Sequence, residues 1–138
     1  MAEDTHAAVQ DWLAETLQAQ GARAGSVHHE RDGDLVLTAA VNIPPPVLDR
    51  VRTVARGKGM AGLAQVRRAS VQTCNLQTDD SGRINPMARL VGGGSAVAIP
   101  VFRGEGEVYA VVGLSFDVEG EIPAERLRAL EAAVANVP

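Results

Sequence analysis

The sequence of 138 residues is poor in aromatic side chains, which make up 3% of it. Bases of single-stranded nucleic acids stack on aromatic side chains, so the chain has little material for a surface of that kind. Its charge argues in the same direction, because 13 Lys and Arg face 17 Asp and Glu, for a formal net charge of -4. Nucleic acids and anionic membranes attract basic proteins, and we therefore expect neither as a partner.

Cysteine is also scarce, since Cys74 is the single one. A single cysteine excludes an internal disulfide and a structural metal site built from cysteines. Long apolar runs are missing as well: none reaches the ~18 residues of a membrane span. The first residues, MAEDTHAAV, have neither the basic nor the apolar region of a secretory signal. We therefore expect a cytoplasmic protein.

The hydrophobic content of 46% suits one compact domain over residues 1–138, with a core of Ala, Val, Leu and Ile. The clearest element is a hairpin over residues 95–116, in which two uncharged apolar runs flank a Gly-Glu-Gly-Glu turn. Runs of this kind are typical of strands that are covered on both faces, so the hairpin is predicted to lie at the centre of a sheet.

The two faces of this hairpin differ in bulk, because alternate residues of a strand point to opposite sides. One face carries small residues, which would let helices lie close: Ala96, Ala98, Gly113 and Ser115. The other face carries larger residues, which we expect to look into a core or a cavity: Val97, Ile99, Val112 and Leu114.

Helical spacing and turn residues predict the remaining elements. A first helix runs from Asp4 or Thr5 to Gln20, with Trp12 in its apolar stripe. A helix is expected to follow Pro44-Pro45-Pro46 and to stop only at Gly57, and a last helix begins at Pro123. The other predicted elements are strands at 24–30, 35–41 and 71–76 and short helices at 60–64 and 87–91.

The adjacent residues His28 and His29 lie on the first predicted strand. Neighbours on a strand point to opposite faces, so the two cannot chelate one metal together and at most one of them faces a pocket. The Gly-rich segment Gly57-Lys58-Gly59 invites comparison with a phosphate-binding loop. It lacks the G-x-x-x-x-G-K-[ST] order and follows no predicted strand, which argues against that function.

Several short patterns occur together in one order: Gly57, Gly59 and Gly62; the strand at 71–76; Ser95 followed by Ile99-Pro100-Val101; and Val112-Gly113-Leu114. In this order, over residues 27–134, the chain resembles a GAF domain. The resemblance implies an α+β fold with a central antiparallel sheet of five to six strands. Terminal helices would pack on one face of the sheet, and short helices and loops would cover a cavity on the other.

Members of this family mostly sense small molecules and form dimers. The resemblance therefore implies a sensory or regulatory domain of signal transduction, a homodimer that binds a small-molecule ligand of unknown identity; it assigns no cofactor. Residues 77–89 correspond to the variable lid over the family's cavity, where Arg83 and Arg89 are the cations best placed to meet an anion. The candidate ligand-binding residues are Met60, Thr73, Asn75, Arg83, Asn85, Met87 and Arg89.

Known chemistries of the family find no match in these residues. The Asn-Lys signature of cyclic-nucleotide binders is missing, and Cys74 precedes Asn75 where bilin binders place a histidine. Free methionine sulfoxide reductases of the family cycle through cysteine pairs, which one cysteine cannot form. No ligand cluster for iron is recognisable, and Ser95 and Ser115 have no evident partner base. We therefore expect no metal site and no enzyme.

Two alternatives stay open beside the sensor. In the first, the chain is an interaction module whose cavity is filled by its own side chains, and which works through dimerisation or a separate signalling protein. The expectation that no signal-transmitting segment accompanies the domain favours this alternative. In the second, the chain has a roadblock-like fold with the same order of elements, although that fold lacks the features at residues 57–62 and 99–100.

Overall fold

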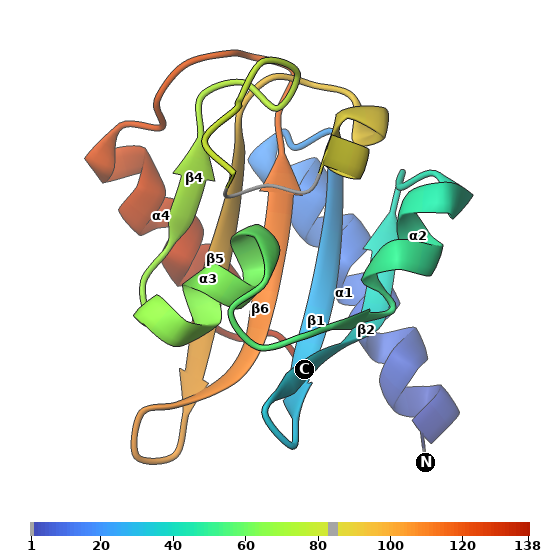
Figure 1. The fold of residues 1–138 in the computed structure, drawn as a ribbon. Coiled ribbons are helices and arrows are strands. Elements are labelled where there is room, and N and C mark those ends of the chain that lie inside the picture. Colours follow the sequence, from blue (N-terminus) through green and yellow to red (C-terminus); the bar gives the residue numbers. More distant parts are fainter. Residues whose placement is uncertain (1, 83–85) are drawn as a thin grey trace.

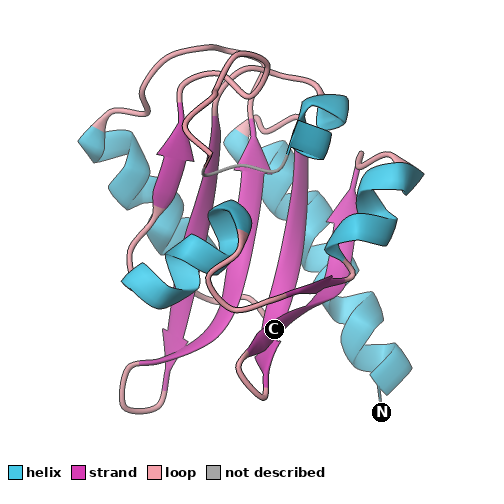
Figure 2. Ribbon diagram, in the orientation of Figure 1, coloured by secondary structure: helices cyan, strands magenta, loops and turns pink. Residues whose placement is uncertain are grey.

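The computed structural model describes residues 2–82 and 86–138, with side chains over residues 6–82 and 89–138. Within these residues, one antiparallel sheet of six strands stands between two layers of helices (Figure 1, Figure 2). In their order across the sheet, the strands are β3 (Thr53–Val54), β2 (Asp34–Val41), β1 (Ala24–Arg31), β6 (Glu107–Ser115), β5 (Ala96–Arg103) and β4 (Val71–Thr73). The chain thus has the α+β architecture that its sequence predicts.

The predicted hairpin is confirmed as strands β5 and β6, which pair with Ile99 opposite Val112. The consecutive residues Val97, Ala98 and Ile99 are all buried, although they point alternately to the two faces. Both faces of the central strands are therefore covered, as expected for uncharged runs of β-branched and small residues.

Helices α1 (Ala2–Gln20) and α4 (Ala124–Val134) cover the rear face of the sheet in the view of Figure 1. Their apolar stripes meet the larger residues of the strands in one core cluster. From the helices this cluster includes Val9, Leu13, Leu17, Leu130 and Val134. From the strands it includes Val27, Val97, Ile99, Val112 and Leu114. The terminal helices therefore pack on one face only, as predicted.

The front face carries α2 (Pro45–Val51), α3 (Gly59–Arg67) and the 3₁₀ helix η1 (Pro86–Val91) (Figure 1). Only α3 packs closely on the sheet, where Ala64 meets Ala98 and Val111. The prediction that helices lie close against the small-residue face is therefore correct for α3 only. The larger residues form the core beneath the terminal helices, and part of the small-residue face stays open because α2 and η1 stand away from it.

Three elements differ from their predicted lengths. Helix α2 ends at Val51 instead of continuing to Gly57, because Thr53 and Val54 pair with the edge of β2. Helix α3 is longer than the predicted 60–64 and ends where Arg68 adopts the left-handed conformation, with φ of 57°. Strand β4 is shorter and stops at Thr73. Apolar spacing predicts which residues of an element face the core. It does not predict the residue at which the element ends, because that depends on backbone pairing.

Gly25 tests how closely α1 packs on the sheet. A Cβ atom there would lie 2.8 Å from Leu17 Cδ2 and 2.9 Å from the backbone oxygen of Gly113. Because the backbone oxygen cannot move aside, Gly25→Ala is expected to lower the free energy of unfolding by about 1–3 kcal/mol, measured by urea denaturation. Gly113→Ala is the matched control, since its Cβ would meet only the Ser26 hydroxyl, at 2.9 Å. Equal stability of the two variants would contradict close packing at Gly25.

Candidate functional site

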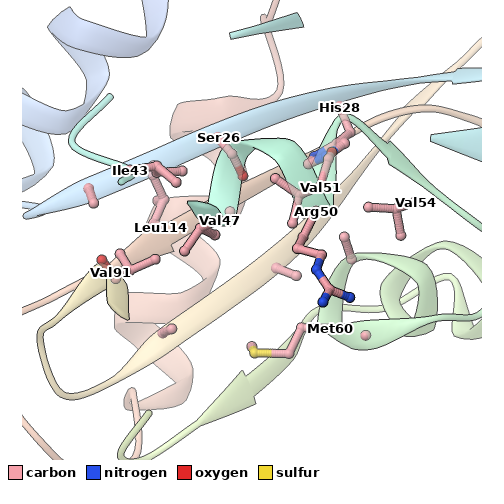
Figure 3. Close-up of a pocket in the computed structure, with 18 of the residues that line it drawn as sticks. Ser26, His28, Ile43, Val47, Arg50, Val51, Val54, Met60, Val91 and Leu114 are labelled. Atoms are coloured by element: carbon pink, nitrogen blue, oxygen red, sulfur yellow. The ribbon is translucent and has the colours of Figure 1, made fainter. Parts of the chain in front are cut away.

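A cavity of about 310 Å³ lies between the front face of the sheet and the helices α2 and α3 (Figure 3). Strands β1, β5 and β6 form its floor. Ile43, Val47, Val51, Val54 and Met60 line it from the helical side. Volumes of about 300–1,000 Å³ are usual for small-molecule sites, so this cavity suits a small metabolite.

The floor of the cavity consists of residues with short side chains. They come from three neighbouring strands: Ala24, Ser26, Ala96, Ala98, Gly113 and Ser115. In the register of the sheet Ser115 lies opposite Ala24 and Ala96, and Gly113 lies opposite Ser26 and Ala98, so all six share one face. Short side chains on the strands and helices held apart above them leave the space that the cavity occupies.

One hydroxyl group of the floor is both buried and without a partner among the described residues. Ser115 is 5% exposed, and its Oγ has no hydrogen bond among the described residues. Leaving a buried donor or acceptor unpaired costs about 1–3 kcal/mol. The hydroxyl thus offers a hydrogen bond to a molecule in the cavity.

His28 is the second polar group of the cavity wall, with 3% of its surface exposed. Its Nε2 lies 2.7 Å from the carbonyl oxygen of Val51. A carbonyl oxygen only accepts, so Nε2 carries the proton, and Nδ1 of the neutral ring is left as an acceptor. Burial lowers the pKa of His28 and outweighs the hydrogen bond to Val51, which favours the charged form.

His29 points to the other face of the sheet, as the alternation of a strand requires. Its Nδ1 lies 2.7 Å from Thr38 Oγ1, and its Nε2 lies 2.8 Å from the Pro138 oxygen. Of the two histidines, the one that faces the cavity is therefore His28. Along β6, its partner Val111 is four residues from Ser115, about 13 Å at 3.3 Å per residue. Ser115 and His28 do not form a nucleophile–base pair at this separation.

The rim of the cavity carries Arg50 from α2 and Lys58 at the start of α3. Three glycines shape the chain here. Gly57 and Gly59 adopt positive φ of 80° and 63°, and a Cβ at Gly62 would lie 2.8 Å from the carbonyl carbon of Gly57. The spacing G-x-G-x-x-G therefore folds a tight turn against the first turn of α3. The prediction that no strand precedes this segment is wrong, because β3 lies directly before it; the G-x-x-x-x-G-K-[ST] order of a phosphate-binding loop is still missing.

The seven candidate residues named from the sequence lie in different places. Met60 lines the cavity. Thr73 is buried and donates its hydroxyl hydrogen to Asp79, whereas the Asn75 side chain accepts a hydrogen bond of 2.8 Å from the amide of Gln77. Arg89 is exposed. Arg83, Asn85 and the side chain of Met87 lie outside the described residues.

Sequence reasoning did not assign Ser26, His28, Arg50, Lys58 or Ser115 to the ligand site. The signal that could have found the floor was the run of small residues on alternate positions of the hairpin, which we had attributed to close helix packing. No local signal placed Arg50, because its position depends on how far α2 stands from the sheet. Among the residues that the structure describes, no three His, Cys, Asp or Glu gather as a metal site would require.

The architecture described here is an α+β fold, with a six-stranded antiparallel sheet, terminal helices behind it and a cavity in front. The sequence model of the GAF domain matches residues 2–137. The chain therefore belongs to the GAF domain family. No curated protein matches it.

Solved structures of the same fold include both enzymes and GAF domains of other proteins. The type II free methionine-R-sulfoxide reductase of Thermoplasma acidophilum superposes with a TM-score of 0.77 at 17% identity, over 98% of this chain and 89% of that one. The GAF domain/HD domain protein of Geobacter sulfurreducens superposes with a TM-score of 0.74 at 13% identity, over 99% of this chain and 90% of that one. The free methionine-R-sulfoxide reductase of Neisseria meningitidis, solved with its substrate, superposes with a TM-score of 0.71 at 15% identity, over 95% of this chain and 75% of that one.

These similarities correct one expectation. We expected no enzyme, because the sequence shows no catalytic constellation and only one cysteine. The fold, however, is shared with free methionine-R-sulfoxide reductases. The absence of familiar sequence patterns therefore does not separate this chain from enzymes, and the non-enzyme expectation is not supported.

The two histidines predict a pH dependence of stability. Burial lowers the pKa of both His28 and His29 in the folded state, so on acidification the unfolded chain binds protons first. The free energy of unfolding is therefore expected to fall as the pH drops below the unfolded value of about 6.5, by up to about 1.4 kcal/mol per pH unit for the buried His28. The half-exposed His29 contributes less, because solvent screens its surroundings. Urea unfolding at several pH values between about 7.5 and 5.5 measures this slope.

The variant His28→Gln is expected to show a shallower slope, because it removes the more deeply buried of the two imidazoles. His29→Gln serves as its counterpart on the other face. A slope in His28→Gln equal to that of the unchanged protein would contradict the neutral state inferred for His28.

Proposed function

We propose that this GAF domain is a sensory or regulatory domain that binds a small molecule in the cavity between the sheet and helices α2 and α3. The observation that carries the proposal is the Ser115 hydroxyl, which is buried beside a space of about 310 Å³ and has no hydrogen-bond partner among the described residues. A ligand that bonds to this hydroxyl would remove the cost of leaving it unpaired.

The open cavity favours this function over the interaction module with a filled cavity. A protein that used the fold only as a scaffold would gain stability by filling the space with larger side chains. Here the floor keeps five short side chains and a glycine next to open space. A separate signalling protein as the recipient of the signal stays part of the proposal.

A second part of the proposal is that two copies associate through their terminal helices. Helix α1 exposes Ala7, Ala8, Ala14 and Ala19, and small side chains allow a close approach of another helix. The cytoplasmic location expected from the sequence stays a prediction. In the part of the chain that the structure describes, no helix combines the length and the apolar content that a membrane span needs.

Filling the cavity tests the binding function. Ser26 lies on β1 beside Gly113 of the floor, and Figure 3 shows its side chain among those that line the cavity. Ser26→Leu is expected to weaken binding at least tenfold, because the larger side chain occupies the ligand's space. Ligand-observed NMR with a mixture of small metabolites measures binding. Ser26→Ala is the matched control, since it removes the hydroxyl without filling the cavity, and should still bind.

The binding function would be refuted if no compound of the mixture bound the unchanged protein, or if Ser26→Leu bound as well as Ser26→Ala. Thermal unfolding of each variant checks that both are folded.

The dimer has its own test. At micromolar concentration we expect sedimentation velocity to show a dimer, and Ala14→Lys to shift it toward the monomer because a charge would be buried between two helices. Val66→Lys is the control, since Val66 is an exposed residue of α3 on the opposite face of the sheet. A monomer at all concentrations would rule out the dimer.

A further inference from the structure

The charged side chains around the cavity are all of one sign. Arg50 and Lys58 line it, and among its described lining residues there is no Asp or Glu. The chain as a whole has a net charge of -4, so the cavity is a positive region on an acidic protein. His28 adds no charge near neutral pH, because burial lowers its pKa.

Neither cation is neutralised by the protein. Arg50 and Lys58 are exposed, and neither side chain has a hydrogen bond or ion pair among the described residues. By contrast, the neighbouring Arg52 pairs with Asp49 at 3.3 Å. Figure 3 shows the Arg50 side chain extending from α2 toward Met60, which belongs to the first turn of α3.

The first turn of α3 adds hydrogen-bond donors at the same place. Gly59, Met60 and Ala61 line the cavity, and the first backbone amide of the helix with an intrachain acceptor is that of Gly62, which donates to Lys58 at 2.9 Å. The three preceding amides have no acceptor among the described residues, and Lys58 supplies no side-chain cap. Free amides at the positive end of a helix favour an anion.

The walls of the cavity are aliphatic. Ile43, Val47, Val51, Val54 and Leu76 surround the space, and no Phe, Tyr or Trp is among its described lining residues. A flat aromatic ring therefore finds no stacking partner here, whereas an alkyl body buries its surface well. The unpartnered hydroxyl of Ser115 is independent evidence that the same space is built for an occupant.

We propose that the ligand is a small aliphatic anion, with a carboxylate or phosphate headgroup held by Arg50, Lys58 and the first amides of α3, and an alkyl body over the floor of the sheet. This proposal rests on the proposed function and adds the chemical class of the ligand. The headgroup replaces the missing partners of both cations, and the alkyl body displaces water from the aliphatic walls.

The test compares probes that share one alkyl chain and differ in the headgroup: hexanoate, hexyl phosphate, hexanol and hexylamine. Isothermal titration calorimetry measures each affinity at neutral pH. Hexanoate or hexyl phosphate is expected to bind at least tenfold more tightly than hexanol, and hexylamine least tightly. The tighter of the two anions identifies the headgroup.

Two variants test whether the rim residues cause the preference for an anionic headgroup. Arg50→Gln and Lys58→Gln are each expected to weaken binding of the preferred anion on the order of tenfold, since each loses a charged hydrogen bond, and to leave hexanol unchanged. Arg56→Gln is the matched control, because Arg56 is exposed nearby and does not line the cavity. Melting temperatures confirm that all three variants fold alike.

Three results would overturn the proposal. They are tighter binding of hexanol than of both anions, equal anion affinity in the rim variants and in Arg56→Gln, and no binding of any of the four probes. In each case, ligand-observed NMR with the metabolite mixture, on the unchanged protein and on Ser26→Leu, separately tests whether the cavity binds any ligand. Hexanol binding that Ser26→Leu abolishes would keep the proposed function and reject the anion.

Discussion

The unequal bulk of the two faces of the central sheet is the constraint on which the rest of this structure depends. On the rear face, Val27, Ile99 and Val112 are large enough to fill the space beneath α1 and α4, and this packing forms the main core. On the front face, the same strands carry Ala, Ser and Gly. A layer of helices can then cover that face and still leave a space, because stability is already provided on the other side.

The cavity combines this open floor with a rim that comes from a separate part of the chain. The glycines at 57, 59 and 62 fold the turn before α3 and bring its first amides to the edge of the cavity. Helix α2 brings Arg50 to the same edge. The cavity therefore has polar groups on its floor, aliphatic walls and cations on its rim. This distribution of polar and apolar groups is the basis for proposing an amphipathic anion as the ligand.

Much of the fold could be predicted because the signals are local. The β-branched runs of β5 and β6 and the apolar stripe of α1 each lie within one element, and several short patterns in one order identified the family. The site was harder to predict. Met60 was named as a ligand residue and lines the cavity, whereas Thr73 makes a hydrogen bond to Asp79 and Arg89 is exposed. Ser115 was considered as a nucleophile and as a small residue that lets helices lie close, because its role in the floor depends on its neighbours Ala24 and Ala96 across the strands.

By itself, the sequence determined the order of the elements apart from β3, the two-faced central hairpin and the family, since these depend on spacing along the chain. It also determined that His28 and His29 point to opposite faces, because alternation is a property of any strand. Only the tertiary structure decided which face forms the core and which the cavity, and that His28 faces the cavity. Those outcomes depend on how far α2 and α3 stand from the sheet, which is set by packing between residues distant in sequence and not by any local pattern.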